Sequence, residues 1–293
     1  MNLFKIIVII LISLLSSCKV DKVPSSESVH LTIASDYLEA SDTTLFTLCS
    51  DSLNITIEIL KMSADQLIGE TRNKGFNTGI DIVMMKSVFD VNRLRRLNVF
   101  HPLENTQLRN VWYDHNVIPL ALDHFLLVDK SHSTSNAMDT ISDPLTYQVL
   151  TNEELVVYLS FNFDYIDPIL ISASVNKAKE SYTKNRRDLW QCNKLIVLKS
   201  DYDMLSKDSL FRQFNWEKPI TTSSYNALTV GILNQSPNYN KTLDFVNLMR
   251  GENFLNLLTH RVKLFEISSY SDSLQLNLKD RIQYFSRVEK ILR

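Results

Sequence analysis

Residues 30–97 alternate between short apolar runs that suit strands and segments that suit helices, and this alternation constrains the fold most. The run Ile55–Leu60 has the period of two that a half-buried strand requires. Ser63 and Gln66 have the spacing of a capping box, and Gly75 would end the helix that they begin. The pattern predicts strands over 30–34, 55–60 and 80–85, and helices over 42–53 (capped by Asp42 or Thr43), 63–74 and 88–97. Three such repeats are typical of a parallel sheet with helices on both faces.

The remainder of the chain predicts a second globular part that interrupts the first. The apolar stretch Val117–Asp129 is expected to be extended, and residues 132–143 are polar and rich in turn formers. Further strands are predicted over 195–198 and 227–233, and further helices over 153–161, 165–181, 203–214, 239–258 and 276–292. We therefore expect lobe 1 at residues 30–125 plus 222–293, and a shortened lobe 2 at 126–221. Two crossings between lobes would form a hinge beside a ligand cleft.

The first 18 residues have the features of an export signal. Lys5 supplies a positive charge, and Ile6–Leu15 is an apolar run about half as long as a membrane-spanning helix. Leu15, two serines and Cys18 then match a lipobox, where a peptidase cuts before a lipid-modified cysteine. We expect a signal peptide at 1–17, lipidation of Cys18 (palmitate among the acyl chains) and a flexible tether over 18–29. The alternatives are an ordinary secretory signal and a short anchor that is never cleaved.

Composition excludes several classes of protein. The chain contains five glycines, none in a G-x-G-x-x-G or Walker arrangement, so the common nucleotide-binding loops are absent from the sequence. A formal net charge of −2 without a basic block argues against nucleic acid as a partner. No nucleophile elbow, H-E-x-x-H or C-x-x-C motif occurs, so we expect neither an enzyme nor a resident cofactor. Cys49 and Cys192 are expected to be buried free thiols, although export would permit a disulfide.

Four stretches of the sequence resemble a known family in their order of elements. They are residues 31–37, residues 63–75, residues 81–103 and residues 225–249. Together they resemble the extracytoplasmic substrate-binding proteins of ABC importers, in particular the ferric-iron-binding group. The resemblance implies an α/β, two-lobed type 2 periplasmic-binding-protein-like fold, with two mixed sheets flanked by helices and joined by a two-strand hinge.

The resemblance also implies where a ligand would bind. The family holds iron with a pair of tyrosines, and their position falls at Ser200–Tyr202, where Asp201 and Tyr202 become candidate metal ligands. Carboxylate and phenolate oxygens suit a hard, highly charged cation. Gln66 falls where the family has a first-lobe Glu or Gln, whereas no histidine stands near Tyr37, the family's histidine position.

Two further tyrosines are candidate ligand contacts, and each candidate has a simpler interpretation. Tyr37 follows a predicted strand, where ligands gather in α/β sheets, and Tyr225 lies near the return to lobe 1. The alternatives are structural roles: Asp201 would cap a helix, Tyr202 would be half-buried, Gln66 would belong to the capping box, and Tyr225 would pack in the core.

The functional prediction is a membrane-anchored solute-binding lipoprotein of the bacterial envelope. It would capture a small molecule, ferric iron or another metal or anion complex between its lobes and present it to an ABC permease. The alternative is a lipoprotein with a binding fold and no role in transport, acting in envelope interactions or assembly.

Overall fold

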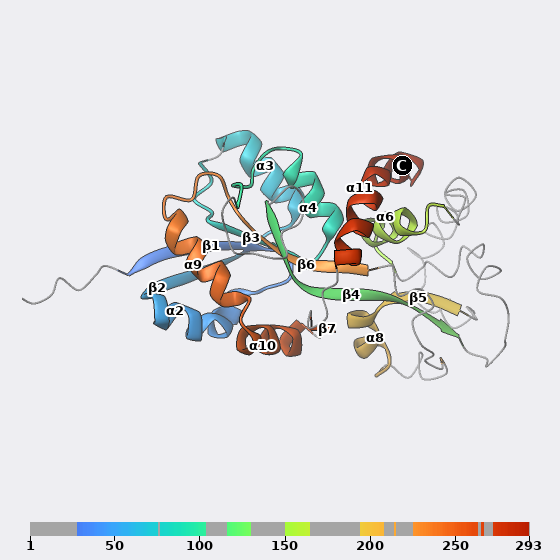
Figure 1. Ribbon diagram of the computed structural model, residues 1–293, viewed down its shortest axis with the longest axis horizontal. Coiled ribbons are helices and arrows are strands. Elements are labelled where there is room, and N and C mark those ends of the chain that lie inside the picture. The colour runs from blue at the N-terminus through green and yellow to red at the C-terminus, as the bar shows by residue number, and fades with distance from the viewer. Residues whose placement is uncertain are drawn as a thin grey trace, which may run out of the picture.

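The computed structural model describes residues 28–75, 77–103, 116–129, 150–164, 194–207, 214, 225–262, 265–266 and 272–292. A mixed sheet with the strand order β2-β1-β3-β6-β4-β5 forms its centre, and β7 also pairs with β4 (Figure 1). The predicted signal peptide and most of the predicted tether lie outside the described residues. So do the predicted turn-rich segment 132–143, the predicted helix 165–181 and Cys192. Within the described ranges, no helix is long and apolar enough to cross a membrane.

The amino-terminal half of the sheet is parallel, as the sequence predicts. Strand β1 (Val29–Ser35) lies between β2 (Ile55–Lys61) and β3 (Ile82–Met85) and runs parallel to both. All four residues of β3 are buried, whereas β2 alternates between buried and exposed positions. The difference follows from position, because β3 is an inner strand and β2 lies at the edge of the sheet.

The other half of the sheet is antiparallel and contains the crossing strand. Strand β6 (Tyr225–Ile232) pairs with β3 on one side and with the first part of β4 (Val117–Asp129) on the other. Beyond His124, β4 instead pairs with β5 (Lys194–Leu198) through Phe125–Asp129. Strand β7 (Phe265–Glu266) pairs with β4 at Ala121 and Leu122. The sequence predicts two mixed sheets, and the structure connects their strands in one order. Strand β4 makes the connection, because its first part pairs with β6 and its second part with β5.

Helices cover both faces of the sheet (Figure 1). One face packs against α3 (Ala64–Lys74), α4 (Val88–Arg95), α6 (Asn152–Phe161) and α11 (Asp272–Leu292), and the other against α2 (Thr47–Leu53), α9 (Tyr239–Met249) and α10 (Glu252–Val262). The capping box of α3 forms as predicted, and Gly75 ends that helix with a φ of 63°. Cys49 is a buried free thiol, as expected.

Several helix boundaries differ from the sequence prediction. The segment expected as one helix over 42–53 is a 3-10 helix, η1 (Ala40–Phe46), followed by α2, and the capping residue is Glu39. The predicted helix 239–258 is broken between α9 and α10 at Gly251. Helix α8 (Lys199–Leu205) begins directly after β5, earlier than the predicted start at 203. Helix α11 begins at Asp272 rather than 276, because apolar spacing alone does not locate a helix start.

Helix α6 links the parts of the chain that the sequence assigns to different lobes. It packs on α11 and on α4, and its residues belong to the same apolar cluster as those of α4. The predicted lobe boundaries stay a prediction, whereas the α/β architecture with mixed strands and flanking helices is confirmed.

Candidate functional site

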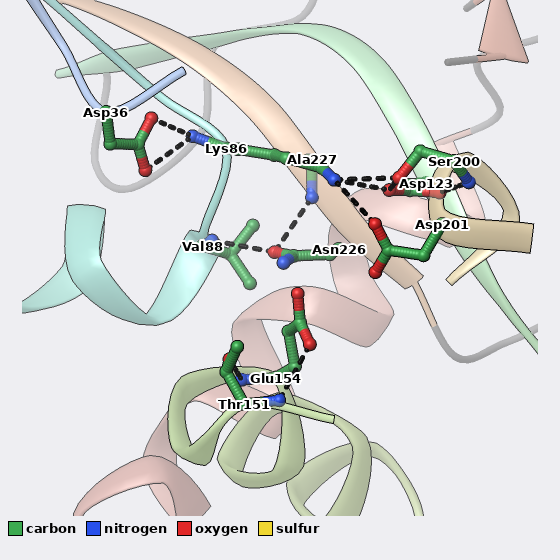
Figure 2. A network of polar contacts seen from close by, with 10 residues as sticks. All are labelled: Asp36, Lys86, Val88, Asp123, Thr151, Glu154, Ser200, Asp201, Asn226 and Ala227. Carbon is green, nitrogen blue, oxygen red and sulfur yellow. Dashed lines mark hydrogen bonds and ion pairs between the residues drawn. The ribbon is translucent and has the colours of Figure 1, made fainter. Parts of the chain in front are cut away.

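Side chains from three distant parts of the chain meet beside the crossing strand (Figure 2). The ammonium of Lys86 donates a hydrogen bond of 2.7 Å to the hydroxyl of Ser200. Its nitrogen lies 3.5 Å from a carboxylate oxygen of Asp123 and 3.9 Å from one of Asp201. Lys86 follows β3, Asp123 belongs to β4, and Ser200 and Asp201 belong to the first turn of α8. We call these four residues the polar cluster.

Local structure holds Lys86 at the junction between β3 and α4. The carboxylate of Asp36, which follows β1, accepts the backbone N–H of Lys86 at 3.0 Å. Ser87 caps α4 by accepting from the amide of Asp90. The side-chain oxygen of Asn226 on β6 accepts the amide of Val88 at 2.9 Å, so another unpaired donor of this helix end is satisfied.

Strand β4 and helix α8 are tied together by Asp123. Its two carboxylate oxygens accept from the backbone N–H of Ser200 at 3.0 Å and from the Ser200 hydroxyl at 2.6 Å. The Ser200 hydroxyl therefore donates to Asp123 while it accepts from Lys86. The side chain of Asp123 is 0% exposed, and such a carboxylate requires compensation of this kind.

Burial dominates the electrostatics of the polar cluster. It raises the pKa of Asp123, an effect that the Lys86 ammonium and the two Ser200 hydrogen bonds oppose. Burial acts to lower the pKa of Lys86, but the carboxylates of Asp123 and Asp201 outweigh it and the pKa is raised. Lys86 therefore keeps its charge at neutral pH.

Two carboxyl groups around the polar cluster have pKa values near neutrality. Burial raises the pKa of Glu154 on α6 to about 7, and that of Asp36 to about 6, in each case against hydrogen bonds from backbone amides that lower it. The carboxyl group of Glu154 points from α6 toward Asn226 and the polar cluster (Figure 2). The site thus combines one fixed cation with several carboxyl groups, two of which can take up a proton.

The structure separates the two predicted metal ligands. Asp201 faces Lys86, and its side chain is 28% exposed. Tyr202 instead packs against the apolar cluster of β4, β5 and Phe214, and Lys199 lies over its ring with 5.7 Å to the centroid. Successive helical residues point about 100° apart, so these neighbours face different surroundings. Among the residues that the structure describes, no three His, Cys, Asp or Glu side chains are grouped to hold a metal ion.

Gln66 and Tyr37 both lie in the segment predicted to form the first lobe, Gln66 on α3 and Tyr37 after β1. The side-chain oxygen of Gln66 accepts the Ser63 amide at 2.8 Å, while the Ser63 hydroxyl accepts the Gln66 amide, and both residues lie near solvent. Tyr37 packs against the core on the face of α9, and burial raises the pKa of its hydroxyl. In the described part of the chain this buried hydroxyl has no hydrogen-bond partner.

Tyr225 is a core residue at the start of β6. It is completely buried, with its ring centroid 4.8 Å from that of Phe161 and 6.2 Å from that of His124. This is the packing role that the sequence left open as the alternative. The predicted ligand roles of Tyr37, Gln66, Asp201, Tyr202 and Tyr225 remain predictions.

Sequence reasoning missed Lys86, Asp123 and Asn226. Asp123 interrupts the apolar stretch Val117–Asp129, and a charged residue at a buried strand position is a signal of a special environment. Lys86 directly follows a completely buried strand, where functional side chains gather in α/β folds. The contact between Lys86 and Ser200 could not be read from the sequence, because the two residues are separated by 114 positions.

Comparison with known proteins gives a result for structure and none for sequence. No protein-family model matches the chain. No curated protein matches it in sequence either.

Solved structures match the chain over most of its length. Iron-bound HitA from Pseudomonas aeruginosa has a TM-score of 0.67 and 12% identity, with 90% of this chain and 99% of that chain covered. The ferric binding protein from Campylobacter jejuni has a TM-score of 0.68 and 12% identity, with 89% and 98% covered. A Trichodesmium protein, IdiA or FutA, in complex with iron and citrate has a TM-score of 0.67 and 10% identity, with 90% and 98% covered. The chain has the two-lobed α/β fold of the periplasmic ferric-binding proteins.

Proposed function

We propose that this chain is an extracytoplasmic solute-binding lipoprotein that captures a small ligand between two lobes for import by an ABC permease. The observation that carries the proposal is the polar cluster. Charged side chains from the end of β3, from the crossing strand β4 and from the start of α8 meet at one place. The likeness to ferric-binding proteins over about nine-tenths of the chain supports a binding role rather than an enzymatic one.

Capture would work through closure of the predicted lobes, 30–125 plus 222–293 and 126–221. A ligand that contacts both lobes is bound more tightly by the closed form, and this difference in affinity shifts the population toward closure. The first lobe would contribute Lys86, Tyr37 and Gln66, and the second would contribute Asp201 and Tyr202. Strands β4 and β6, which pair with each other, would run through the region where the predicted lobes join.

Ferric iron, or another metal or anion complex, is the ligand class that the resemblance suggests. Asp201 and Tyr202 offer the hard oxygen atoms that such an ion prefers. Tyr202 would have to turn from its packing against Phe214, and an exogenous anion would have to supply further ligand atoms.

The proposed anchor is lipid on Cys18, with the folded part outside the cytoplasm. Each buried methylene of an acyl chain contributes about 0.8 kcal/mol of membrane affinity, so two or more chains hold a protein stably. A Cys18→Ser variant expressed in a bacterial host is expected to leave the membrane fraction. A variant that stays there as the wild type does would remove lipidation from the proposal.

Ligand capture is tested by thermal melting of the whole chain in detergent with ferric citrate, other metal ions and small anions. A ligand is expected to raise the melting temperature by several degrees when it is present at about 100 times its Kd, which corresponds to about 2.7 kcal/mol. The increase should be lost in Asp201→Asn and in Tyr202→Phe. Tyr239→Phe is the matched control, because Tyr239 stacks on His101 at 4.0 Å, away from the polar cluster. No increase with any of these compounds would overturn the proposal.

A second function, a binding-fold lipoprotein acting in envelope assembly without transport, is favoured by one observation. The Lys86 ammonium already lies among the carboxylates that a metal ion would need. An ABC permease and ATPase encoded beside the gene would argue for import, and their absence together with no ligand response would argue for this second function.

A further inference from the structure

Among the described residues, the ammonium of Lys86 adds a direct contact between the β3–α4 junction and the β5–α8 segment, whose strand pairs with β4. Lys86 leaves β3, which pairs with β1 and β6 of the first lobe. Ser200 and Asp201 begin α8, which follows β5, and the described pairing of β5 is with the far part of β4. One hydrogen bond, to Ser200, and one ion pair, to Asp201, therefore reach from Lys86 to the β5–α8 segment, while the ion pair with Asp123 joins Lys86 to β4.

The groups of the described residues that face the ammonium are acceptors or anions. Ser200 accepts its hydrogen bond, Asp123 and Asp201 lie within 4 Å, and the more distant Glu154 also favours the charged form of the lysine. The side chain of Lys86 is 26% exposed and that of Asp123 is 0% exposed. Charges screened so little by water attract each other more strongly than those of a surface pair.

The other contacts between the predicted lobes include a second ion pair, between Arg281 of α11 and Asp164 after α6, and apolar packing. Helix α6 packs on α4 and α11 through apolar side chains on one face of the sheet. Such packing holds helices together but does not fix the first turn of α8. The position of that turn relative to the first lobe is set by Lys86 from one side and by Asp123 from the other.

We propose that Lys86 is a built-in latch, a tethered cation that fastens the β5–α8 segment to the first lobe while no ligand is bound. The latch holds this part of the chain closed without any solute. A cation that enters between the lobes must displace the Lys86 ammonium from Asp201 and Asp123, so binding is a competition with the protein's own charge. This regulatory role rests on the proposed function in so far as the same side chains would meet the ligand.

The latch is tested without ligand, on the whole chain in detergent, by single-molecule energy transfer. Dyes are attached through unnatural amino acids at Asn73 on α3 and at Lys207 after α8, both of which are exposed. The wild type is expected to show one population at short distance. Lys86→Met should shift molecules to longer distances, and Lys86→Arg, which keeps the charge, should restore part of the short population. Lys61→Met is the matched control, because Lys61 forms an exposed ion pair with Glu39 at 3.0 Å in the same lobe.

Variants on the other side of the contact keep the test decisive if Lys86→Met does not fold. Ser200→Ala with Asp201→Asn removes the hydrogen bond and the ion pair that Lys86 makes with α8, together with the hydroxyl bond from Ser200 to Asp123. It leaves the lysine and the bond from the Ser200 amide to Asp123 in place, and it should lengthen the distance at least as much as Lys86→Met. Identical distributions for the wild type and the folded variants would overturn the latch, as would a wild type that is already open. Because no ligand is present, that result leaves the thermal-melting test of solute binding unaffected.

Discussion

Asp123 holds Ser200 through two hydrogen bonds, one to its backbone amide at 3.0 Å and one to its hydroxyl at 2.6 Å. The two residues are separated by 77 positions in the sequence. The pair fixes the start of α8 against the crossing strand, and the same carboxylate faces the ammonium of Lys86. A single buried aspartate on β4 thereby contacts both Ser200 of α8 and Lys86 after β3.

Removing this carboxylate should destabilise the protein strongly. Asp123→Ala leaves the Ser200 amide and the Lys86 ammonium without their partner, and breaking such a buried pair costs about 3–5 kcal/mol. Asp123→Asn keeps an acceptor for the Ser200 amide and should cost less. Urea unfolding followed by circular dichroism measures the difference in unfolding free energy.

The control for Asp123→Ala is Asp65→Ala. Asp65 pairs with Arg93 at the surface, with 76% of its side chain exposed, and exposed pairs contribute about 1 kcal/mol or less. Equal losses of stability in the two variants would show that the buried pairing of Asp123 is not the source of the effect.

Glu154 should make stability fall as the pH rises toward neutrality. Burial raises its pKa from the ordinary 4.5 to about 7, so the folded state binds the proton more tightly than the unfolded state. Between these two pH values the folded state carries more protons, and the unfolding free energy therefore decreases as the pH rises. Melting temperatures at pH 5 and pH 7.5 measure this dependence.

Glu154→Gln isolates the contribution of this carboxyl group. The glutamine carbonyl can still accept the Thr151 amide, which Glu154 accepts at 2.9 Å, so the cap of α6 is retained. The variant should lose less stability between pH 5 and pH 7.5 than the wild type does. The same pH dependence in both proteins would contradict the raised pKa of Glu154.

The elements of the first lobe could be predicted because their signals are local. Strand β2 has the period of two, α3 has its capping box, and β4 spans the predicted range Val117–Asp129. Each of these features depends on residues that are close together in the sequence. The start of α8 was missed because Asp201 suits the position before a helix, whereas the helix begins at Lys199, Asp201 lies in its first turn, and Asp123 binds Ser200 there.

The candidate site was less predictable because its contacts are distant in sequence. Asp201 was identified by position in a resemblance, and its partner Lys86 lies far away in the sequence, between β3 and α4. Periodicity shows that β3 and β5 are strands, but it does not show which side chains meet where they end. The sequence allowed Tyr225 to be a ligand contact, although a packing residue was the simpler interpretation, and the tertiary arrangement places it against Phe161.

Gln66 can be tested for its two roles separately. As half of the capping box it should contribute to stability together with Ser63, and replacing the cap residue in Ser63→Ala should cost about 1 kcal/mol. Gln66→Ala should lower the unfolding free energy by less, because the Ser63 hydroxyl still accepts an amide. If Gln66 also contacts ligand, Gln66→Ala alone should reduce the ligand-induced rise in melting temperature. If Ser63→Ala reduces the ligand-induced rise in melting temperature as much as Gln66→Ala does, the role of Gln66 is structural only.

Gly231 should not tolerate a side chain while Phe100 is present. It lies in β6 opposite Val83 of β3, and an added Cβ would be 2.6 Å from two ring carbons of Phe100, which is itself buried. Overfilling a packed core costs about 1–3 kcal/mol, so Gly231→Ala should lower the unfolding free energy by that amount. Phe100→Leu removes the ring edge and should make the second substitution less costly in the double variant. Urea unfolding of the four proteins gives the coupling between the two sites, and additive losses would mean that this close approach does not explain the glycine.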